Sequence, residues 1–164
     1  KIIDVGAWWG PWSLWWHDKA QRVEIFEPNK DILPKLVNNV GKFQNCEIHH
    51  TALGDRHGSV SMQCADHSGT YHVTGQDGDI EMKTLDSFAF DSVDIIKIDA
   101  EGYELPVLQG AKETISRNRP WIQVEGNKSG ERYGRTKVDI KNFLSDLGMT
   151  RVIKKWPDQV WTFR

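Results

Sequence analysis

The stretch IIDVGAWWGPWSLWW, residues 2–16, organises the rest of the chain. Its apolar beginning predicts a buried strand that carries one charged residue, Asp4. Gly6 and Gly10 then allow a sharp turn and a close approach of the backbone to a ligand, since glycine has no Cβ. Pro11 is typical of a first helical position, and a helix that begins there directs unpaired N–H groups toward the turn. The sequence therefore predicts a strand, a glycine turn and a helix, a unit found in ligand sites and in ordinary corners alike.

A second strand supports a ligand site at this turn. VEIFEPN, residues 23–29, ends on Glu27, which stands 21 positions after Gly6. An acidic residue roughly 20 positions beyond the glycines binds the ribose hydroxyls in nucleotide-binding α/β folds. Dinucleotides and S-adenosylmethionine share this ribose contact. Trp8 occupies the place of the second glycine in the dinucleotide pattern G-x-G-x-x-G, and this disfavours a dinucleotide.

The remaining chain alternates between helices and strands. Apolar residues at helical spacing predict helices over 30–43, from Leu105 to Ile115, and over 138–147. Strands are predicted over 48–53, over 93–98, up to Glu125, and over 150–156 and 159–164, the last two as a hairpin. Residues 55–83 alternate between apolar and polar around the Gly/Ser/His-rich segment 67–79, which predicts an inserted β-hairpin with a mobile tip.

This alternation predicts an α/β fold. We expect a three-layer sandwich with a mostly parallel sheet, helices on both faces and a C-terminal antiparallel hairpin. Residues 1–164 are expected to form a single domain, and because the chain starts on a strand and without a methionine, we allow for residues ahead of it. Ligands of such sheets bind at the carboxyl ends of the strands. We therefore expect five residues to converge there: Gly6, Glu27, Asp99, Glu101 and Glu125.

Composition and charge limit the class of function. The chain has 164 residues and a formal net charge of −2, and it lacks an apolar run of the ~18 residues that a membrane span requires. Cys46 and Cys64 show no disulfide or zinc pattern, and the six histidines show no metal-ligand spacing. We therefore expect no metal and a reducing, cytoplasmic compartment. The net charge argues against bulk binding to nucleic acid.

Five motifs together resemble one family. DVGAWWGPWSL, VEIFEPN, TALGD, KTLDS and IIKIDAEGYELPVLQGA are similar, in order and spacing, to successive motifs of the FkbM family of S-adenosylmethionine-dependent methyltransferases. The resemblance covers residues 2 to about 125, and IKIDAEGYE is its most specific part. It implies a seven-stranded, Rossmann-like class I methyltransferase sheet and O-methylation, often of sugar or polyketide hydroxyls. Trp8 and Trp9 depart from the small or polar residues that the family usually has in the turn.

The resemblance also implies roles for individual residues. It implies that Asp4, Gly6 and Gly10 bind the methionine part of S-adenosylmethionine and that Glu27 binds the ribose hydroxyls. Ala52 and Leu53 would contact the adenine, and Asp99 would lie beside the transferred methyl group. Ala7 and Pro28 are further cofactor contacts. Asp99 is expected to fix the methionine ammonium group. Glu101 is expected to orient or deprotonate the acceptor hydroxyl, with a pKa lowered by the following helix. His72 is the alternative base.

The acceptor side is less defined. Trp8 and Trp9 are candidates for stacking on the cofactor or on a sugar ring, whereas Trp12, Trp15 and Trp16 share one helix face and are expected in the core. Residues 112–164 carry 12 Lys/Arg against 6 Asp/Glu. For this reason Arg132 and Arg135, which follow the strand that ends on Glu125, are candidates for binding an anionic acceptor. The predicted acceptor site consists of Trp8, Trp9, Glu125, Arg132 and Arg135.

Three classes of function stay open. The first is a methyltransferase that modifies a hydroxyl of a glycan or another small metabolite. The second is a cofactor-binding module without turnover, and the third is a nucleic-acid methyltransferase. The intact IDAEG motif together with Glu27 favours the first class, and the sequence lacks the N/D-P-P-Y type of motif used in amino-methylation. The sequence does not name the acceptor or the oligomeric state.

Overall fold

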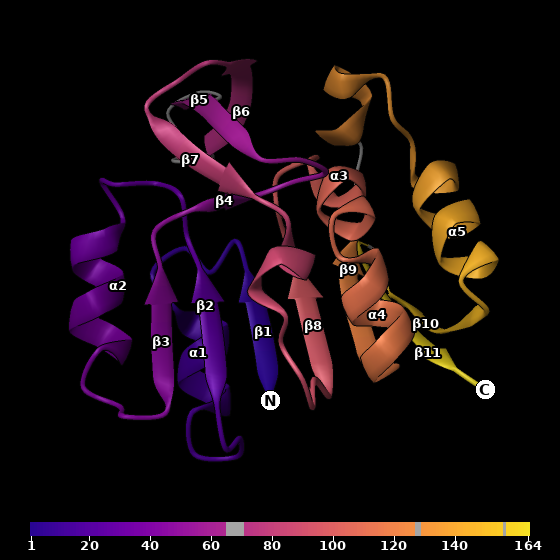
Figure 1. Cartoon of the computed structure of the whole chain (residues 1–164), viewed down its shortest axis with the longest axis horizontal. Coiled ribbons are helices and arrows are strands. Elements are labelled where there is room, and N and C mark those ends of the chain that lie inside the picture. Colours follow the sequence, from indigo (N-terminus) through magenta and orange to yellow (C-terminus); the bar gives the residue numbers. More distant parts are fainter. Residues whose placement is uncertain (65–70, 127–128, 156) are drawn as a thin grey trace.

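The computed structural model describes residues 1–64, 71–126, 129–155 and 157–164 (Figure 1). Residues 67–70 of the predicted mobile tip lie outside the described residues, as does residue 156 at the end of a predicted strand. The strands are β1 Ile2–Val5, β2 Val23–Phe26, β3 Cys46–His49, β4 Ala52–Leu53, β5 Gly58–Cys64, β6 Tyr71–Gln76, β7 Ile80–Lys83, β8 Ile95–Ile98, β9 Trp121–Glu125, β10 Met149–Lys155 and β11 Asp158–Phe163. The helices are α1 Pro11–Trp16, α2 Leu33–Val40, η1 Leu85–Phe88, α3 Glu104–Gln109, α4 Lys112–Asn118, η2 Ser129–Tyr133 and α5 Lys137–Asp146.

The main sheet has seven strands in the order β10-β11-β9-β8-β1-β2-β3. The pairs β9/β8, β8/β1, β1/β2 and β2/β3 are parallel, and β11 is antiparallel to both β9 and β10. The predicted mostly parallel sheet with a C-terminal antiparallel hairpin is thus confirmed. The strand order changes direction at β1, whose neighbours are β2 and β8, and this is the position where open α/β sheets bind their ligands.

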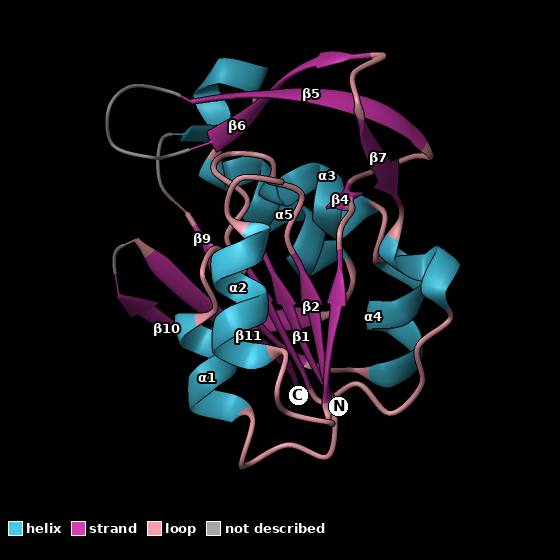
Figure 2. Cartoon of the chain, turned by 90° about the vertical axis from the view of Figure 1, so that its left-hand side faces the viewer, coloured by secondary structure: helices cyan, strands magenta, loops and turns pink. Residues whose placement is uncertain are grey.

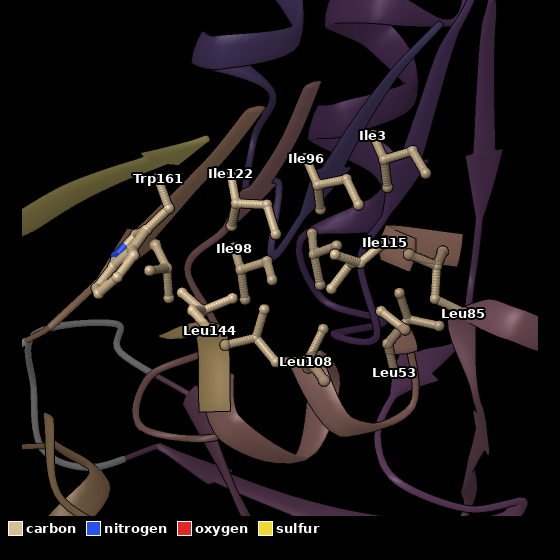
Figure 3. Close-up of a cluster of buried hydrophobic side chains, with 14 of the residues drawn as sticks. Ile3, Leu53, Leu85, Ile96, Ile98, Leu108, Ile115, Ile122, Leu144 and Trp161 are labelled. Carbon is tan, nitrogen blue, oxygen red and sulfur yellow. The ribbon is translucent and has the colours of Figure 1, made fainter. Parts of the chain in front are cut away.

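Helices cover both faces of this sheet. Figure 2 shows α1 and α2 on one side and α4 on the other. The larger core cluster lies between the sheet and α3, α4 and α5; among its fully buried members are Ile3, Ile96, Ile98, Ile122, Trp161, Leu108, Ile115 and Leu144 (Figure 3). Each such side chain contributes about 1.5–3 kcal/mol by leaving water. Because side chains alternate along a strand, Lys97 of β8 points to the opposite face from Ile96 and Ile98.

A second sheet covers the carboxyl ends of the main strands. It contains four strands in the order β4-β7-β5-β6 and lies above the main sheet in Figures 1 and 2. The prediction of one strand over 48–53 was wrong. β3 ends at His49, and β4 leaves the main sheet to pair with β7. Thr51 supports this break, since its hydroxyl donates to the carbonyl of Glu81 at 2.9 Å. The segment predicted as a hairpin is therefore a larger sheet, within which β5 and β6 are antiparallel neighbours.

The predicted helix from Leu105 to Ile115 is two helices, α3 and α4, that meet at Gly110. A Cβ at Gly110 would lie 1.9 Å from the carbonyl oxygen of Gly54, so this position requires glycine. Asp86 holds the start of α4, because its carboxylate accepts the backbone N–H groups of Glu113 and Thr114 at 3.0 and 2.7 Å. Within the described residues, no helix has both the length and the apolar character needed to cross a membrane.

The tryptophan face of α1 differs from its prediction. Trp15 is 65% exposed and not in the core, and Trp12 and Trp16 are only half-buried. The residue of α1 that is fully buried is Ser13, because its hydroxyl donates to the buried carboxylate of Asp4 at 2.6 Å. The spacing of Trp12, Trp15 and Trp16 therefore predicted that they share one helix face, but the prediction that this face is buried in the core was wrong.

Glu24 of β2 contributes to the free energy of unfolding through buried hydrogen bonds. Its side chain is 4% exposed, and its carboxylate accepts hydrogen bonds from Arg22 Nε at 3.0 Å and from His49 Nε2 at 2.7 Å. Burial alone would raise the pKa of Glu24, but the bonds from His49 and Arg22 outweigh it and lower that pKa. We expect Glu24→Gln to lower the free energy of unfolding by about 1.5–3 kcal/mol near pH 7, measured by urea denaturation.

The pH dependence of this effect has a defined sign. A lowered pKa in the folded state gives stability that is present above the unfolded glutamate pKa of 4.5 and is lost as pH falls through the folded value. The difference between wild type and Glu24→Gln should therefore shrink in acid. Glu47→Gln, which removes an exposed partner of Arg22, is the control and should cost less than about 0.5 kcal/mol. A difference between wild type and Glu24→Gln that does not change with pH would contradict this assignment.

Candidate active site

A cavity of about 360 Å³ lies at the carboxyl ends of β1, β2 and β8, beneath the second sheet. Of the predicted site residues, those that line it are Gly6, Trp8, Glu27, Pro28, Ala52, Leu53, Asp99 and Glu101. The predicted residues outside its lining are Asp4, Ala7, Trp9, Gly10, His72, Glu125, Arg132 and Arg135. The structure adds residues that were not predicted, among them Asn29 from β2's end and Met62, Tyr71, Val73 and Tyr103 from the far wall. Strand ends far apart in the sequence therefore build one cavity, as expected.

Glu27 joins the glycine turn to the end of β2. Its carboxylate is 6% exposed and accepts the backbone N–H of Trp8 at 2.7 Å and that of Asn29 at 2.9 Å, one on each oxygen. Trp8 itself has a φ of 55°, a conformation that non-glycine residues rarely adopt. Each carboxylate oxygen keeps a further lone pair for a ligand hydroxyl. Burial raises the pKa of Glu27, although the bonds from Asn29 and Trp8 oppose the shift.

Asn29 leaves a buried polar group open at the same cavity. Its side-chain oxygen accepts the backbone N–H of Asp31 at 3.0 Å, but its buried Nδ2 has no hydrogen-bond partner among the described residues. A buried donor without a partner costs about 1–3 kcal/mol, so a ligand that supplies an acceptor here would gain affinity. Asn29 follows directly from the EPN motif, which is the signal by which it could have been found.

Asp4 and Gly10 support the turn from behind the cavity. Asp4 is fully buried, where it accepts the Ser13 hydroxyl and pairs with Lys97 at 3.1 Å. Gly10 has a φ of 91°, and a Cβ there would lie 2.9 Å from Leu36, so glycine is needed for the turn to pack against α2. The two residues thus shape the turn, and the structure places neither at the cavity surface.

Lys97 is the functional candidate that the prediction missed. Although it belongs to an apolar strand, its Nζ donates to the carbonyl oxygens of Gly6 at 2.8 Å and Val5 at 3.4 Å. It also lies 3.1 Å from an Asp4 oxygen and 3.9 Å from an Asp99 oxygen. The signal in the sequence is one lysine between the isoleucines of IIKID, since lysine is almost never fully buried without a partner.

The turn after β8 carries Asp99 and Glu101. Glu101 has a φ of 53°, and Gly102 a φ of 98°; a Cβ at Gly102 would collide with the backbone of Ser129. The expected lowering of the Glu101 pKa by the following helix was wrong. Burial and then the charge of Asp99 raise that pKa. Glu101 also precedes α3, which begins at Glu104 and is only six residues long. A raised pKa makes Glu101 a better proton acceptor than an ordinary carboxylate.

Glu104 anchors this turn from inside. Its buried Oε1 accepts the backbone N–H groups of Ala100 at 3.1 Å and Gly102 at 2.9 Å, and burial raises its pKa. One carboxylate oxygen each of Asp99, Glu104 and Glu125 lie within 4.8 Å of one another. Glu125 therefore reaches the predicted rim, next to Asp99, although it does not line the cavity. Such a group of carboxylates is able to hold a cation, which makes the expected independence from metal a point for experiment.

The second sheet provides the far wall. Tyr71 and Val73 of β6 line the cavity, and His72 between them does not, as the alternation of a strand requires. Burial, and then the charge of Arg132, lower the pKa of His72. Tyr133 connects β6 to η2, because its hydroxyl donates to the carbonyl of Val73 at 2.8 Å.

The two predicted arginines lie outside the cavity lining. Arg132 of η2 is exposed, and its charge acts on both Glu101 and His72. Arg135 donates to the side chain of Gln109 at 3.2 Å. At the turn, Trp8 is 51% exposed at the cavity, whereas the Trp9 carbonyl accepts a bond from Asn39 outside it. Of the aromatic and basic residues predicted for the acceptor, Trp8 is the one that borders the cavity.

Solved structures share this fold. A methyltransferase FkbM from Methylobacillus flagellatus matches 99% of this chain and 43% of its own, with a TM-score of 0.69 and 19% identity. SMU.1697c from Streptococcus mutans, solved in complex with S-adenosylhomocysteine, matches 98% of this chain and 85% of its own, with a TM-score of 0.60 and 11% identity. The fold is the Rossmann-like fold of class I methyltransferases.

The family follows from the sequence. The family model described as the methyltransferase FkbM domain matches residues 4–149, and the chain belongs to this family. Among curated proteins, the 2-O-methyltransferase NoeI of Sinorhizobium fredii is 26% identical over an alignment of 126 residues, with a coverage of 62% of this chain and 51% of NoeI. The chain thus spans about half the length of this relative.

Proposed function

We propose that this chain binds S-adenosylmethionine in the cavity and transfers its methyl group to a hydroxyl of a sugar, a glycan or another small hydroxylated metabolite. The observation that carries the proposal is the buried Glu27 carboxylate at the cavity, with a free lone pair on each oxygen. Membership of the FkbM family supports methyl transfer, and the relative NoeI, which is named as a 2-O-methyltransferase, favours a hydroxyl acceptor.

The cavity lining fits this cofactor from end to end. Ala52 and Leu53 provide an apolar, buried wall for the adenine, and Glu27 accepts the ribose hydroxyls. The unpartnered Nδ2 of Asn29 would donate to the same nucleoside. Asp99, beside Gly6, would hold the methionine ammonium group. S-adenosylmethionine, when bound, supplies an electrophilic methyl group on a sulfonium.

The chain's own groups would then prepare the acceptor. Glu101 lies at the cavity with a raised pKa, so it can orient the acceptor hydroxyl and accept its proton as the new bond forms. Trp8 and Tyr71 offer aromatic surfaces on which a sugar ring can stack. Met62, Tyr71 and Val73 of the second sheet line the cavity and would help to hold the acceptor close to the donor, which is the main requirement of an in-line transfer. Arg132 would favour an acceptor with an anionic group near Glu101.

A screen for label transfer tests this function. The chain is incubated with isotope-labelled S-adenosylmethionine and a panel of glycans and small hydroxylated metabolites, and products are read by mass spectrometry. We expect label on an oxygen of at least one acceptor, and no loss of turnover with a chelator. Cofactor binding without any transfer would favour the binding module, and label on RNA would favour a nucleic-acid methyltransferase. Loss of turnover with the chelator, with the fold intact, would assign a cation to the carboxylates of Asp99, Glu104 and Glu125.

A further inference from the structure

We propose that Lys97 is a positioning residue for the amino-acid end of the cofactor site: it holds the Gly6 turn and Asp99 in the arrangement that binds the methionine part of S-adenosylmethionine. The inference rests on the proposed function. Lys97 does not line the cavity, so the role proposed for it is indirect.

Lys97 reaches the turn from below. It stands on β8 in register with Asp4 of β1, and the two strands are parallel, so both side chains point toward α1. Lys97 is only 9% exposed. An ammonium group has three donors and no acceptor. Lys97 Nζ donates to Gly6 O at 2.8 Å and to Val5 O at 3.4 Å, and it forms an ion pair with Asp4 Oδ1 at 3.1 Å; all three oxygens belong to β1 or to the turn that follows it.

The same group joins two segments that must stay together. Asp99 N–H donates to Val5 O at 3.1 Å, and a Cβ at Gly6 would lie 1.8 Å from Asp99 O. The turn after β1 and the end of β8 are thus in direct backbone contact, and Lys97 Nζ bridges them, with Asp99 Oδ2 at 3.9 Å. Its loss would displace Gly6 and Asp99 together. Among the described residues, Glu27, Ala52 and Leu53 at the nucleoside end make no hydrogen bond or ion pair with Lys97. The charges of Lys97 and Asp4 shift the pKa of Glu27 in opposite directions, so the removal of both charges should leave the nucleoside end in place.

The alternative role is purely structural, because Asp4 is a buried charge that requires a counter-ion. Removal of Lys97 alone leaves this charge unpaired, so Lys97→Met is expected to unfold more easily for that reason alone. Exchange of both partners for neutral residues of similar shape is often neutral for stability. A comparison of Lys97→Met/Asp4→Asn with Asp4→Asn alone therefore separates the two roles: an amide oxygen at position 4 can still accept the Ser13 hydroxyl in both variants, and Asp4→Asn keeps the bond from Lys97 to Gly6 and should keep the affinity for the cofactor.

The experiment compares three ligands by calorimetry: S-adenosylmethionine, S-adenosylhomocysteine and 5′-methylthioadenosine, which lacks the amino-acid part. For Lys97→Met/Asp4→Asn we expect an unfolding midpoint close to wild type. The affinity for the first two ligands should fall by about ten- to a hundredfold, as for a charged hydrogen-bond network that is lost. The affinity for 5′-methylthioadenosine should change by less than about twofold. Lys112→Met on the exposed face of α4 is the matched lysine control and should leave all three affinities unchanged.

Three results would contradict the proposed role of Lys97 or the proposed function. Unchanged affinity for S-adenosylmethionine in the double variant would return Lys97 to a mere counter-ion of Asp4. An equal loss for all three ligands would show a general distortion of the site and would also overturn the proposal. If the wild-type chain binds none of the three ligands, the proposed function itself fails, and this result is recognised before any variant is made.

Discussion

Glu101→Gln should keep the affinity for S-adenosylmethionine and lower the rate of a single turnover by about 10²- to 10⁴-fold. Glu101 lies at the cavity, close enough to Asp99 for that charge to raise its pKa, and it holds a left-handed backbone conformation. Both features cost stability, and such costs concentrate at functional sites. The amide keeps the shape of the side chain but cannot accept a proton. Rapid mixing with saturating cofactor and an accepted substrate measures the rate.

The pH profile adds a second reading. Because a base must be deprotonated, kcat/KM of the wild type should fall as pH falls through the raised pKa of Glu101, above the ordinary value of 4.5. Glu101→Gln should lack this acid limb. Asp99→Asn is the matched variant and should show the opposite pattern, with a loss of cofactor affinity. A single-turnover rate equal to that of the wild type in Glu101→Gln would exclude Glu101 from the acceptor side.

Stability provides an internal control for this variant. The pKa of Glu101 is raised in the folded state, so the stability that this group contributes is fully present below the unfolded pKa and is lost as pH rises through the folded value. At pH 7, Glu101→Gln should therefore unfold at a higher temperature than the wild type. A slower enzyme with a higher melting temperature cannot owe its lost rate to unfolding, and calorimetry measures both melting temperatures.

Glu27→Ala should weaken the binding of S-adenosylmethionine and S-adenosylhomocysteine alike by about a hundredfold. The substitution removes charge-assisted bonds to the ribose hydroxyls, each worth about 1.5–3 kcal/mol. It also releases the backbone N–H groups of Trp8 and Asn29, which position the turn. Isothermal calorimetry compares the dissociation constants. Glu24→Gln on β2, the strand that Glu27 follows, is the control, since it disturbs a buried carboxylate away from the cavity and should leave both affinities unchanged.

The raised pKa of Glu27 makes this binding sensitive to acid. The carboxylate form can accept two hydroxyl bonds, whereas a protonated oxygen loses part of this capacity. Cofactor affinity of the wild type should therefore decline as pH falls through the raised pKa of Glu27, at a higher pH than an exposed glutamate would produce. Equal affinities of wild type and Glu27→Ala would remove Glu27 from the ribose role.

Much of the fold was predictable because strong local signals agree with it. The apolar runs before Asp4, Glu27 and Asp99 predicted parallel strands, and their carboxyl ends do border one cavity. The second sheet was not predictable in full, because β4 has two residues and its partner lies about 30 positions away. The division between α3 and α4 depends on the approach of Gly110 to Gly54, a long-range contact without a local signal.

The candidate site was likewise predictable only where the signal is local. Spacing and motif led to Glu27, Asp99 and Glu101, but the partners of a buried group depend on which strands are neighbours. Lys97 meets the Gly6 turn only because β8 pairs with β1, 91 positions away. The sign of the Glu101 pKa shift likewise depended on burial and on the nearby charge of Asp99. Helical spacing placed Trp15 on one face with Trp12 and Trp16, yet Trp15 is 65% exposed while its two neighbours are half-buried.

The most direct test of the account is a crystal structure of this chain with S-adenosylhomocysteine. The account predicts the nucleoside in the cavity between the glycine turn and Leu53, with both ribose hydroxyls within hydrogen-bond distance of the Glu27 carboxylate. The amino-acid end should lie at Gly6 and Asp99, above Lys97, with Glu101 facing the open side of the sulfur. A ligand bound elsewhere, or a ribose turned away from Glu27, would contradict it.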